Sequence, residues 1–215
     1  MLQVNAPISL LPAFSDPVSD SQYVFRSLLK SMAEPGMTGD IPESSRQKLN
    51  DSKLYSSSWS IARALFDYDT LVYISPELGS ESVIRSIQFQ TDARITNDLS
   101  KADFALVTLS ELTRDNPFKK GTIERPHESC TLIIQVDEID LEGAQIEISG
   151  PGIEHARQLS IAGLETEQMD AITLNQALYP CGLDFIFCTR QTFIALPRTT
   201  AISGIARTKG DSVCM

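Results

Sequence analysis

The chain has 215 residues, 42% of them hydrophobic, and a formal net charge of −10 at pH 7. This length is enough to bury one core, and an acidic balance without any basic run excludes the usual electrostatic footprint of a nucleic-acid binder. No segment approaches the roughly 18 consecutive apolar residues of a membrane span, and residues 1–5 lack the basic start of a signal peptide. We therefore expect a soluble, cytoplasmic protein that binds neither nucleic acid nor a membrane.

Residues 1–18 predict an extended N-terminal arm, because three prolines interrupt scattered apolar side chains. Leu10, Leu11 and Phe14 are the arm residues with the most apolar surface to bury. We expect them to pack either onto a neighbouring subunit or onto the main body of the chain.

A helix is predicted after the arm. Ser19 is a suitable N-cap, and Gln22 completes a capping box. Pro35 and Gly36 end the helix. Apolar side chains recur at i, i+3, i+4 and i+7, which indicates one buried face. The predicted buried residues are Phe25, Leu28, Leu29 and Met32.

Apolar runs alternate with segments of helical spacing over the rest of the chain, which is the pattern of an α/β protein. We predict strands over residues 71–74, 103–109, 131–136, 145–149, 183–189 and 192–196. Two of these strands are expected to form hairpins with earlier ones, 145–149 with 131–136 and 192–196 with 183–189. We predict helices over residues 59–66 and 165–178, and another that Ser80 caps. The inward side chains of the last helix are predicted to be Met169, Ile172 and Leu178.

The run Phe185-Ile186-Phe187 is nearly continuous in its apolar character, which is typical of a strand covered on both faces. Helices between the strands would supply that cover. The sequence thus predicts an α/β fold, a three-layer α/β/α sandwich with a mixed sheet, as one domain over residues 19–202. Residues 203–215 are predicted to be a polar tail.

Two short motifs suggest ligand chemistry, and each has a simpler structural explanation. Gly150-Pro151-Gly152 follows a strand, but the dinucleotide fingerprint needs a third glycine where His155 stands, so we interpret the motif as a turn. Asp67 and Asp69 could hold Mg²⁺ together with substrate phosphates. The same spacing is common in solvated turns, and we favour that interpretation.

Nucleophile, metal and Schiff-base chemistry finds little support in the residues. His127 and Cys130 are too loosely spaced to indicate a nucleophile–base pair, and the acidic run 137–142 lacks the glycine of a calcium loop. The four cysteines form no C-x-x-C pair, so we predict free thiols and neither metal nor cofactor. Among the lysines, Lys101 has the best position for a Schiff base with pyridoxal phosphate, because it comes just before a strand, but it is a weak candidate.

The segment 196–200, Leu-Pro-Arg-Thr-Thr, closes the last predicted strand. An arginine and hydroxyl groups can together grip a phosphate or a carboxylate. The same groups can satisfy the backbone at a strand end or form a subunit contact. The residues alone leave these alternatives open.

Several segments taken together resemble the PhnH family, the H subunits of the bacterial carbon–phosphorus lyase system for phosphonate breakdown. They occur in the family's order between residues 22 and 200, whereas residues 37–57, residues 110–128 and the tail lie outside the resemblance. The matching segments are 25–36 (FRSLLKSMAEPG), 83–89, 150–153 (GPGI), 182–184 (GLD) and 196–200 (LPRTT).

The resemblance implies a fold like a reduced pyridoxal-phosphate transferase without a working cofactor site. It also implies a homodimer that joins the G, I and J subunits in a core complex. With an ATP-binding-cassette-like partner, that complex replaces the adenine of a nucleoside triphosphate by an alkylphosphonate, which gives a ribose 1-phosphonate 5-triphosphate. The J subunit and its iron–sulfur cluster carry the later cleavage of the carbon–phosphorus bond.

We therefore expect a non-catalytic structural subunit without a cofactor of its own. The alternatives are a module that binds a phosphonate or nucleotide through Arg198 and Thr199, and an active pyridoxal-phosphate enzyme that uses Lys101 or another lysine. Five residues in the matching motifs are expected to serve folding, dimer or subunit contacts rather than bond making: Arg26, Glu34, Asp184, Arg198 and Thr199.

Overall fold

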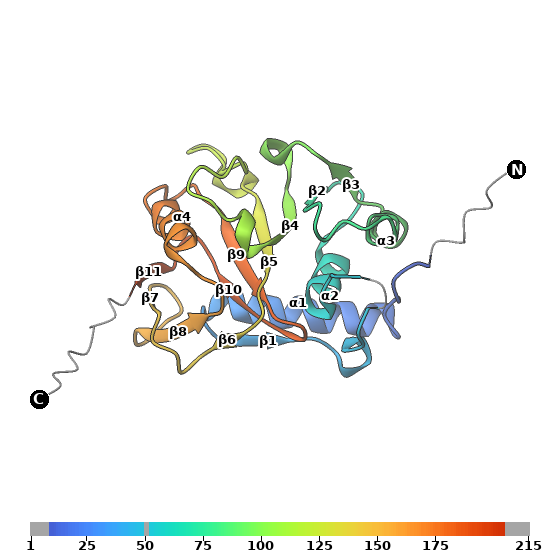
Figure 1. Ribbon diagram of the computed structural model, residues 1–215, viewed down its shortest axis with the longest axis horizontal. Coiled ribbons are helices and arrows are strands. Elements are labelled where there is room, and N and C mark those ends of the chain that lie inside the picture. The colour runs from blue at the N-terminus through green and yellow to red at the C-terminus, as the bar shows by residue number, and fades with distance from the viewer. Residues whose placement is uncertain (1–8, 50–51, 205–215) are drawn as a thin grey trace, which may run out of the picture.

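The computed structural model describes residues 9–49 and 52–204, which fold around a seven-stranded mixed sheet (Figure 1). The strand order is β1-β10-β9-β5-β4-β2-β3. The five strands β9, β5, β4, β2 and β3 run parallel to one another, whereas β10 is antiparallel to β9 and β1 is antiparallel to β10. The hairpin predicted between the last two strands of the sheet is confirmed. The strands are β1 (Thr38–Asp40), β2 (Leu71–Ile74), β3 (Arg94–Thr96), β4 (Phe104–Thr108), β5 (Thr131–Gln135), β9 (Asp184–Cys188) and β10 (Thr192–Leu196).

A second sheet of four antiparallel strands has the order β11-β7-β8-β6. The hairpin predicted between residues 145–149 and 131–136 is therefore wrong, because β7 pairs with β8 and β11 while β5 pairs with β4 and β9. Alternate burial of Ile146 and Ile148 shows that β7 has one buried face, and such a pattern does not specify the partner strand. The strands are β6 (Ile139–Asp140), β7 (Ile146–Ser149), β8 (Arg157–Ile161) and β11 (Ala201–Gly204).

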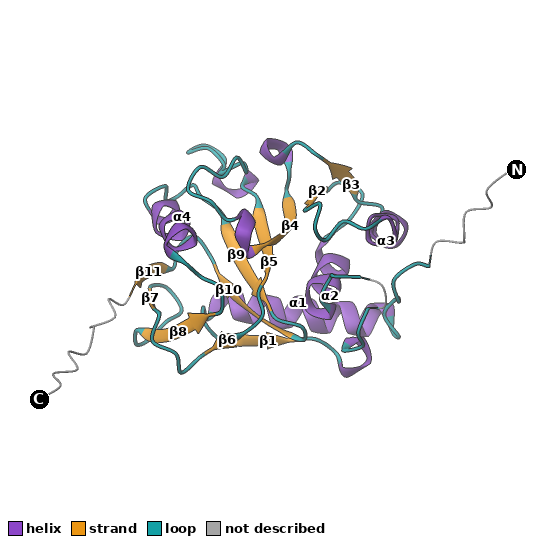
Figure 2. Cartoon of the chain, viewed as in Figure 1, coloured by secondary structure: helices purple, strands orange, loops and turns teal. Residues whose placement is uncertain are grey.

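The large sheet is covered on both faces, but not by helices alone (Figure 2). On one face lie α1 (Pro17–Ala33), α2 (Ser56–Leu65) and α3 (Glu81–Thr91). On the other lie α4 (Thr166–Gln176) and the four-stranded sheet. The predicted mixed sheet is confirmed, and the second covering layer combines a helix with a sheet. The described residues also form four single-turn helices: η1 (Glu43–Ser45), η2 (Leu99–Lys101), η3 (Leu109–Glu111) and η4 (Pro126–Glu128).

The central strands divide their side chains between two apolar cores. In β9, Phe185 and Phe187 join the core beneath the small sheet, whereas Ile186 joins the core beneath the helices, and all three are at most 2% exposed. A strand that buries both faces needs apolar residues at every position, which is why this run reads as continuous. Full burial of one such side chain contributes about 1.5–3 kcal/mol before its entropy cost.

Helix α1 begins earlier than the capping box predicted, and two of its four predicted buried residues are exposed. Its N-cap is Asp16, whose side chain accepts the N–H groups of Val18 and Ser19, and Pro17 fills the first turn. The buried residues are Val24, Leu28 and Ser31. Phe25 and Leu29, predicted to be buried, are 44% and 52% exposed. Leu28 is buried and Met32 packs partly buried against the core, so the spacing rule was right for these two residues and wrong for Phe25 and Leu29.

The described part of the N-terminal arm packs onto the chain's own body. Leu11 and Phe14 are buried, whereas Leu10 is 41% exposed. Side chains of α2 and α3 hold the arm by its backbone, since Trp59 Nε1 donates to the Pro12 carbonyl over 2.9 Å and Gln90 Nε2 to the Leu11 carbonyl over 2.8 Å. Residues 1–8 lie outside the described residues.

The C-terminal part differs from expectation at two points. Leu178, predicted to point inward, lies beyond the end of α4 and is 40% exposed. Ser203 and Gly204, assigned to the polar tail, belong to β11, and the rest of that tail lies outside the described residues. Within the described ranges, no helix combines the length and the hydropathy that crossing a membrane would require.

Candidate functional site

Asp184, the first residue of β9, and Arg198, just after the end of β10, form a side-chain pair. Arg198 Nε donates to Asp184 Oδ1 over 3.1 Å, Nη2 contacts Oδ2, and the Arg198 backbone N–H donates to Oδ1 over 2.8 Å. Nη1 donates to the carbonyl of Pro126 in η4. The two side chains are only 15% and 12% exposed. The guanidinium is thus occupied within the chain, which leaves it little capacity to grip a ligand.

The matching motifs meet in space at the junction of the two sheets. Gly152 has φ +79°, and a Cβ there would lie 1.9 Å from the Ala33 carbonyl oxygen at the end of α1. Gly150 has φ +126°, and its Cβ would lie 2.9 Å from the Thr199 carbonyl oxygen. Glycine is therefore required at both positions, because other backbone segments approach the turn closely. The motif is a turn, as expected, and it packs against the end of α1 on one side and the 196–200 segment on the other.

Three of the predicted site residues, Arg26, Glu34 and Thr199, are exposed. Arg26 lies on the outer side of α1, and Glu34 caps the C-terminal end of that helix with its N–H bonded to the Lys30 carbonyl over 2.8 Å. Thr199 is exposed and lines a cavity of about 400 Å³ beside Arg198 and Tyr179. Arg26 and Glu34 are accessible to another subunit, whereas Arg198 and Asp184 are turned toward the fold.

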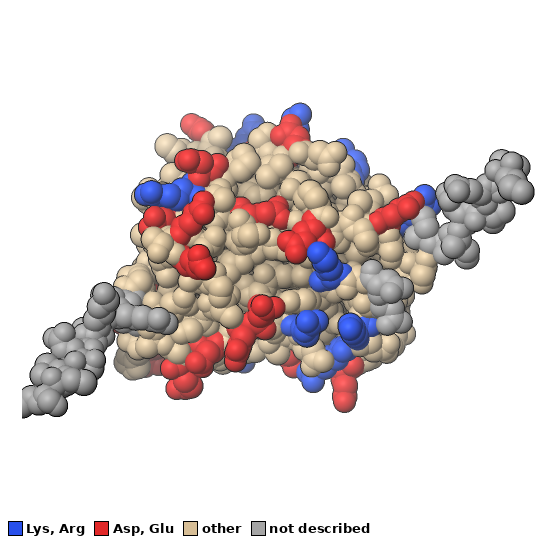
Figure 3. Space-filling model, viewed as in Figure 1, with Lys and Arg blue, Asp and Glu red and all other residues tan. Residues whose placement is uncertain are grey.

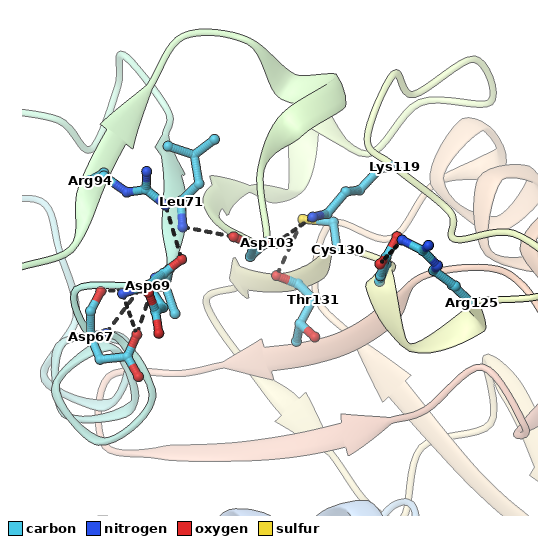
Figure 4. Close-up of polar contacts among 11 residues, drawn as sticks. Asp67, Asp69, Leu71, Arg94, Asp103, Lys119, Arg125, Cys130 and Thr131 are labelled. Carbon is cyan, nitrogen blue, oxygen red and sulfur yellow. Dashed lines mark hydrogen bonds and ion pairs between the residues drawn. The ribbon is translucent and has the colours of Figure 1, made fainter.

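The Asp67–Asp69 pair lies in the turn between α2 and β2 (Figure 4). Asp67 Oδ1 accepts the N–H groups of Asp69 and Thr70, over 3.0 and 3.1 Å, so this carboxylate stabilises its own turn. Asp103, nearby at the start of β4, accepts the Leu71 N–H over 2.8 Å and pairs with Lys119. Among the described residues, no three His, Cys, Asp or Glu side chains are placed to hold a metal ion.

The cysteines that the structure describes are free thiols, as the sequence predicts. Burial raises the pKa of Cys188 to about 12 and raises that of Cys130 further, beyond the range of a reactive thiolate. Figure 4 shows Cys130 directed at the backbone of the next residue, with its Sγ 3.8 Å from the Thr131 carbonyl oxygen. Cys214 lies outside the described residues.

Lys101 lies in η2, and its side chain is 70% exposed and paired with Asp98 over 3.0 Å. It precedes β4 and so lies at the amino ends of the parallel strands. Ligands of open α/β sheets bind at the opposite edge, beyond the carboxyl ends. Neither its position nor its exposure favours a Schiff base with pyridoxal phosphate.

A cavity of about 700 Å³ lies at that opposite edge and contains none of the five predicted site residues. It is lined by Leu78 after β2, Thr108 and Leu109 at the end of β4, and Asp137 after β5. Arg190, from the β9–β10 turn, closes one side. Sequence reasoning missed it because its polar residues come from loops far apart in the chain, and none forms a recognisable motif.

Comparison with known proteins accounts for the pattern of motifs. The family described as "Bacterial phosphonate metabolism protein (PhnH)" matches residues 12–203. The chain is 35% identical over 192 residues, 88% of this chain and 94% of the relative, to the alpha-D-ribose 1-methylphosphonate 5-triphosphate synthase subunit PhnH of Rhizobium meliloti (strain 1021). It is 29% identical over 102 residues, 47% of this chain and 51% of the relative, to the putative C-P lyase subunit protein HtxG of Stutzerimonas stutzeri. The resemblance drawn from the motifs is confirmed, and the chain belongs to the PhnH family of bacterial phosphonate metabolism proteins.

Proposed function

We propose that this chain is a non-catalytic structural subunit of a carbon–phosphorus lyase core complex. In that role it supports the step that replaces the adenine of a nucleoside triphosphate by an alkylphosphonate. The names of its relatives, a subunit of a ribose 1-methylphosphonate 5-triphosphate synthase and a putative C-P lyase subunit, support the assignment. The proposed partners are a second copy of the chain and the G, I and J subunits.

The observation that carries the structural role is the use made of the family motifs. Arg198 donates its hydrogen bonds to Asp184 and to the Pro126 carbonyl. Gly150 and Gly152 allow backbone segments to approach closely. Groups already satisfied inside the fold are poorly placed to stabilise a transition state. The contacts of these motifs therefore support a role in packing the two sheets together rather than a role in substrate chemistry.

Co-expression with the G, I and J subunits, one of them tagged, tests the proposal. We expect the chain to co-purify and to elute with the complex in size-exclusion chromatography. Arg26→Glu should weaken co-purification while the isolated chain keeps its melting temperature, because Arg26 is exposed on α1. Arg85→Glu, on the exposed face of α3, is the matched control. A chain absent from the complex, or one that releases adenine from ATP alone, would contradict the proposal.

The two alternatives make different predictions. A pyridoxal-phosphate enzyme would acquire an absorbance band with the cofactor, fixed by borohydride and lost in Lys101→Ala. A module that binds through Arg198 and Thr199 would show calorimetric binding of a phosphonate that Arg198→Ala abolishes. The exposed position of Lys101 and the intramolecular bonds of Arg198 both favour the structural subunit.

A further inference from the structure

The cavity of about 700 Å³ lies where the order of the parallel strands reverses. The chain runs from β2 outward to β3, then crosses back to place β4 on the other side of β2. The connections that leave the carboxyl ends of β2 and β4 therefore diverge, and Leu78 and Leu109 from these two connections both line the cavity. Such switch points are where open α/β sheets bind small ligands, and this volume lies within the usual range of about 300–1,000 Å³.

Three cationic side chains line one part of this cavity, beside the carboxylates of Glu77, Asp137 and Glu165, in a chain that carries a charge of −10 as a whole. Lys48, Lys53 and Arg190 line it. An adjoining cavity of about 340 Å³ shares Lys48 and Arg190 and adds Arg46. Figure 3 shows Lys and Arg side chains gathered on this face, around the tip of the β9–β10 hairpin and the loop after η1. Clustered cations in a concave site raise the local concentration of anions.

Two of these cations are available to a ligand. Lys53 pairs with Glu77 over 3.5 Å, and Arg46 pairs with Asp40 over 3.4 Å. Lys48 and Arg190 make no ion pair with a carboxylate in the described ranges 9–49 and 52–204. An incoming anion would supply a counter-charge that these two side chains do not receive from any described carboxylate.

A network of fixed groups orients Arg190. Its guanidinium carbon lies 4.9 Å from the centre of the Tyr55 ring, and the Tyr55 hydroxyl donates to Asp137 over 3.1 Å. The buried Gln135 accepts the Tyr55 N–H over 2.7 Å and donates to the Lys53 carbonyl over 3.1 Å. The loop and the aromatic ring are therefore anchored to the end of β5. This anchoring distinguishes the cluster from scattered surface lysines.

On the side of β4 and β5, the cavity is lined by hydroxyl groups and a carboxylate instead of cations. Thr108 and Ser110 there share a hydroxyl contact of 2.9 Å, and Asp137 keeps acceptor capacity beyond its bond to Tyr55. Hydroxyl groups and a carboxylate are suitable partners for the hydroxyls of a sugar. One side of the cavity thus matches an anion, and the other matches a polyol.

We propose that this cavity binds a sugar phosphate or phosphonate, with the anionic group between Lys48 and Arg190 and the sugar hydroxyls toward Thr108, Ser110 and Asp137. The inference does not rest on the proposed structural role. A chain can hold such a ligand whether or not it joins other subunits, and a subunit can join them with the cavity empty.

Calorimetric titration of the full chain at low ionic strength tests the proposal with four probes: ribose 5-phosphate, methylphosphonate, inorganic phosphate and ribose. We expect ribose 5-phosphate to bind at least tenfold more tightly than either small anion, and ribose not to bind. Methylphosphonate binding as tightly as ribose 5-phosphate would show that the sugar adds no affinity and would overturn the assignment of a sugar-binding side. Absence of binding by all four probes would overturn the inference.

Two charge-matched double variants locate the binding. Lys48→Gln with Arg190→Gln should weaken ribose 5-phosphate binding at least tenfold, whereas Lys101→Gln with Arg85→Gln removes the same charge elsewhere and should leave it unchanged. All four side chains are exposed, so both variants should keep the melting temperature of the parent. Equal weakening in both variants would show a general charge effect and refute a site in this cavity.

Discussion

Asp184 at the start of β9 receives three donors from one residue, the backbone N–H, Nε and Nη2 of Arg198. The contact spans β9 and the segment after β10, and Nη1 extends it to η4. A bidentate pair of this kind fixes geometry as well as charge. Because both side chains are largely buried, removal of one partner leaves the other charge uncompensated.

Arg198→Ala is expected to lower the free energy of unfolding by about 3–5 kcal/mol, the cost of breaking a buried pair from one side. Arg198→Lys should recover only part of the loss, since an ammonium cannot reproduce the planar fork. Urea unfolding monitored by circular dichroism measures both.

The exposed pair of Arg85 with Glu81 on α3 is the control for the Arg198 variants. Arg85→Ala should cost no more than about 0.5 kcal/mol, as is usual for pairs four residues apart on a helix. Equal losses for Arg198→Ala and Arg85→Ala would contradict the structural role of the Arg198–Asp184 pair.

Gly152→Ala is expected to destabilise the chain strongly. The left-handed backbone alone costs about 1–2 kcal/mol for a residue with a side chain, and the added methyl group would overlap the Ala33 carbonyl. Gly204→Ala is the matched substitution, because its nearest neighbour would be Met169 Cγ at 3.9 Å and its φ is not positive. Thermal unfolding should separate the two variants by several degrees, and similar melting temperatures would refute the close approach of the turn to α1.

The arm provides a test with a built-in reporter. Phe14 is 6% exposed and lies 3.5 Å from the Arg63 guanidinium, whose pKa burial lowers to about 10. Phe14→Ala should cost about 3–5 kcal/mol. It should also shift the fluorescence of Trp59, the single tryptophan, to longer wavelength, since that ring lies beneath the arm. Leu10→Ala, at a half-exposed position of the same arm, should change neither quantity appreciably.

The strands of the large sheet could be predicted where burial leaves a mark on composition. Phe185-Ile186-Phe187 is apolar at each position because both faces are covered. Ile146 and Ile148 reveal one buried face, yet two sheets were available to pair with them. The pairing was decided by packing against β8 and β11, which local spacing does not encode.

The candidate sites were predictable to different degrees. Asp184 and Arg198 could be selected because both lie in family motifs, but their contact with each other joins positions 14 apart and emerged only from the fold. Lys48 and Arg190 carry no motif, and 142 positions separate them. The pairing of β9 with β5 places the β9–β10 turn beside the end of β5 and so brings the two residues to one cavity, which no pattern in the chain indicates.

The buried thiols predict a loss of stability at alkaline pH. Burial raises the pKa of Cys188 from 9.0 to about 12 in the folded chain, so the unfolded chain loses this proton first. The stabilisation is therefore complete below pH 9 and falls as pH rises through about 12, by at most about 1.4 kcal/mol per pH unit for one thiol. Cys188→Ala removes this dependence. The difference in unfolding free energy between parent and variant should be constant from pH 7 to 8 and shrink above pH 9. A difference that stays constant to pH 10.5 would show that the thiol ionises in the folded chain as readily as in the unfolded one.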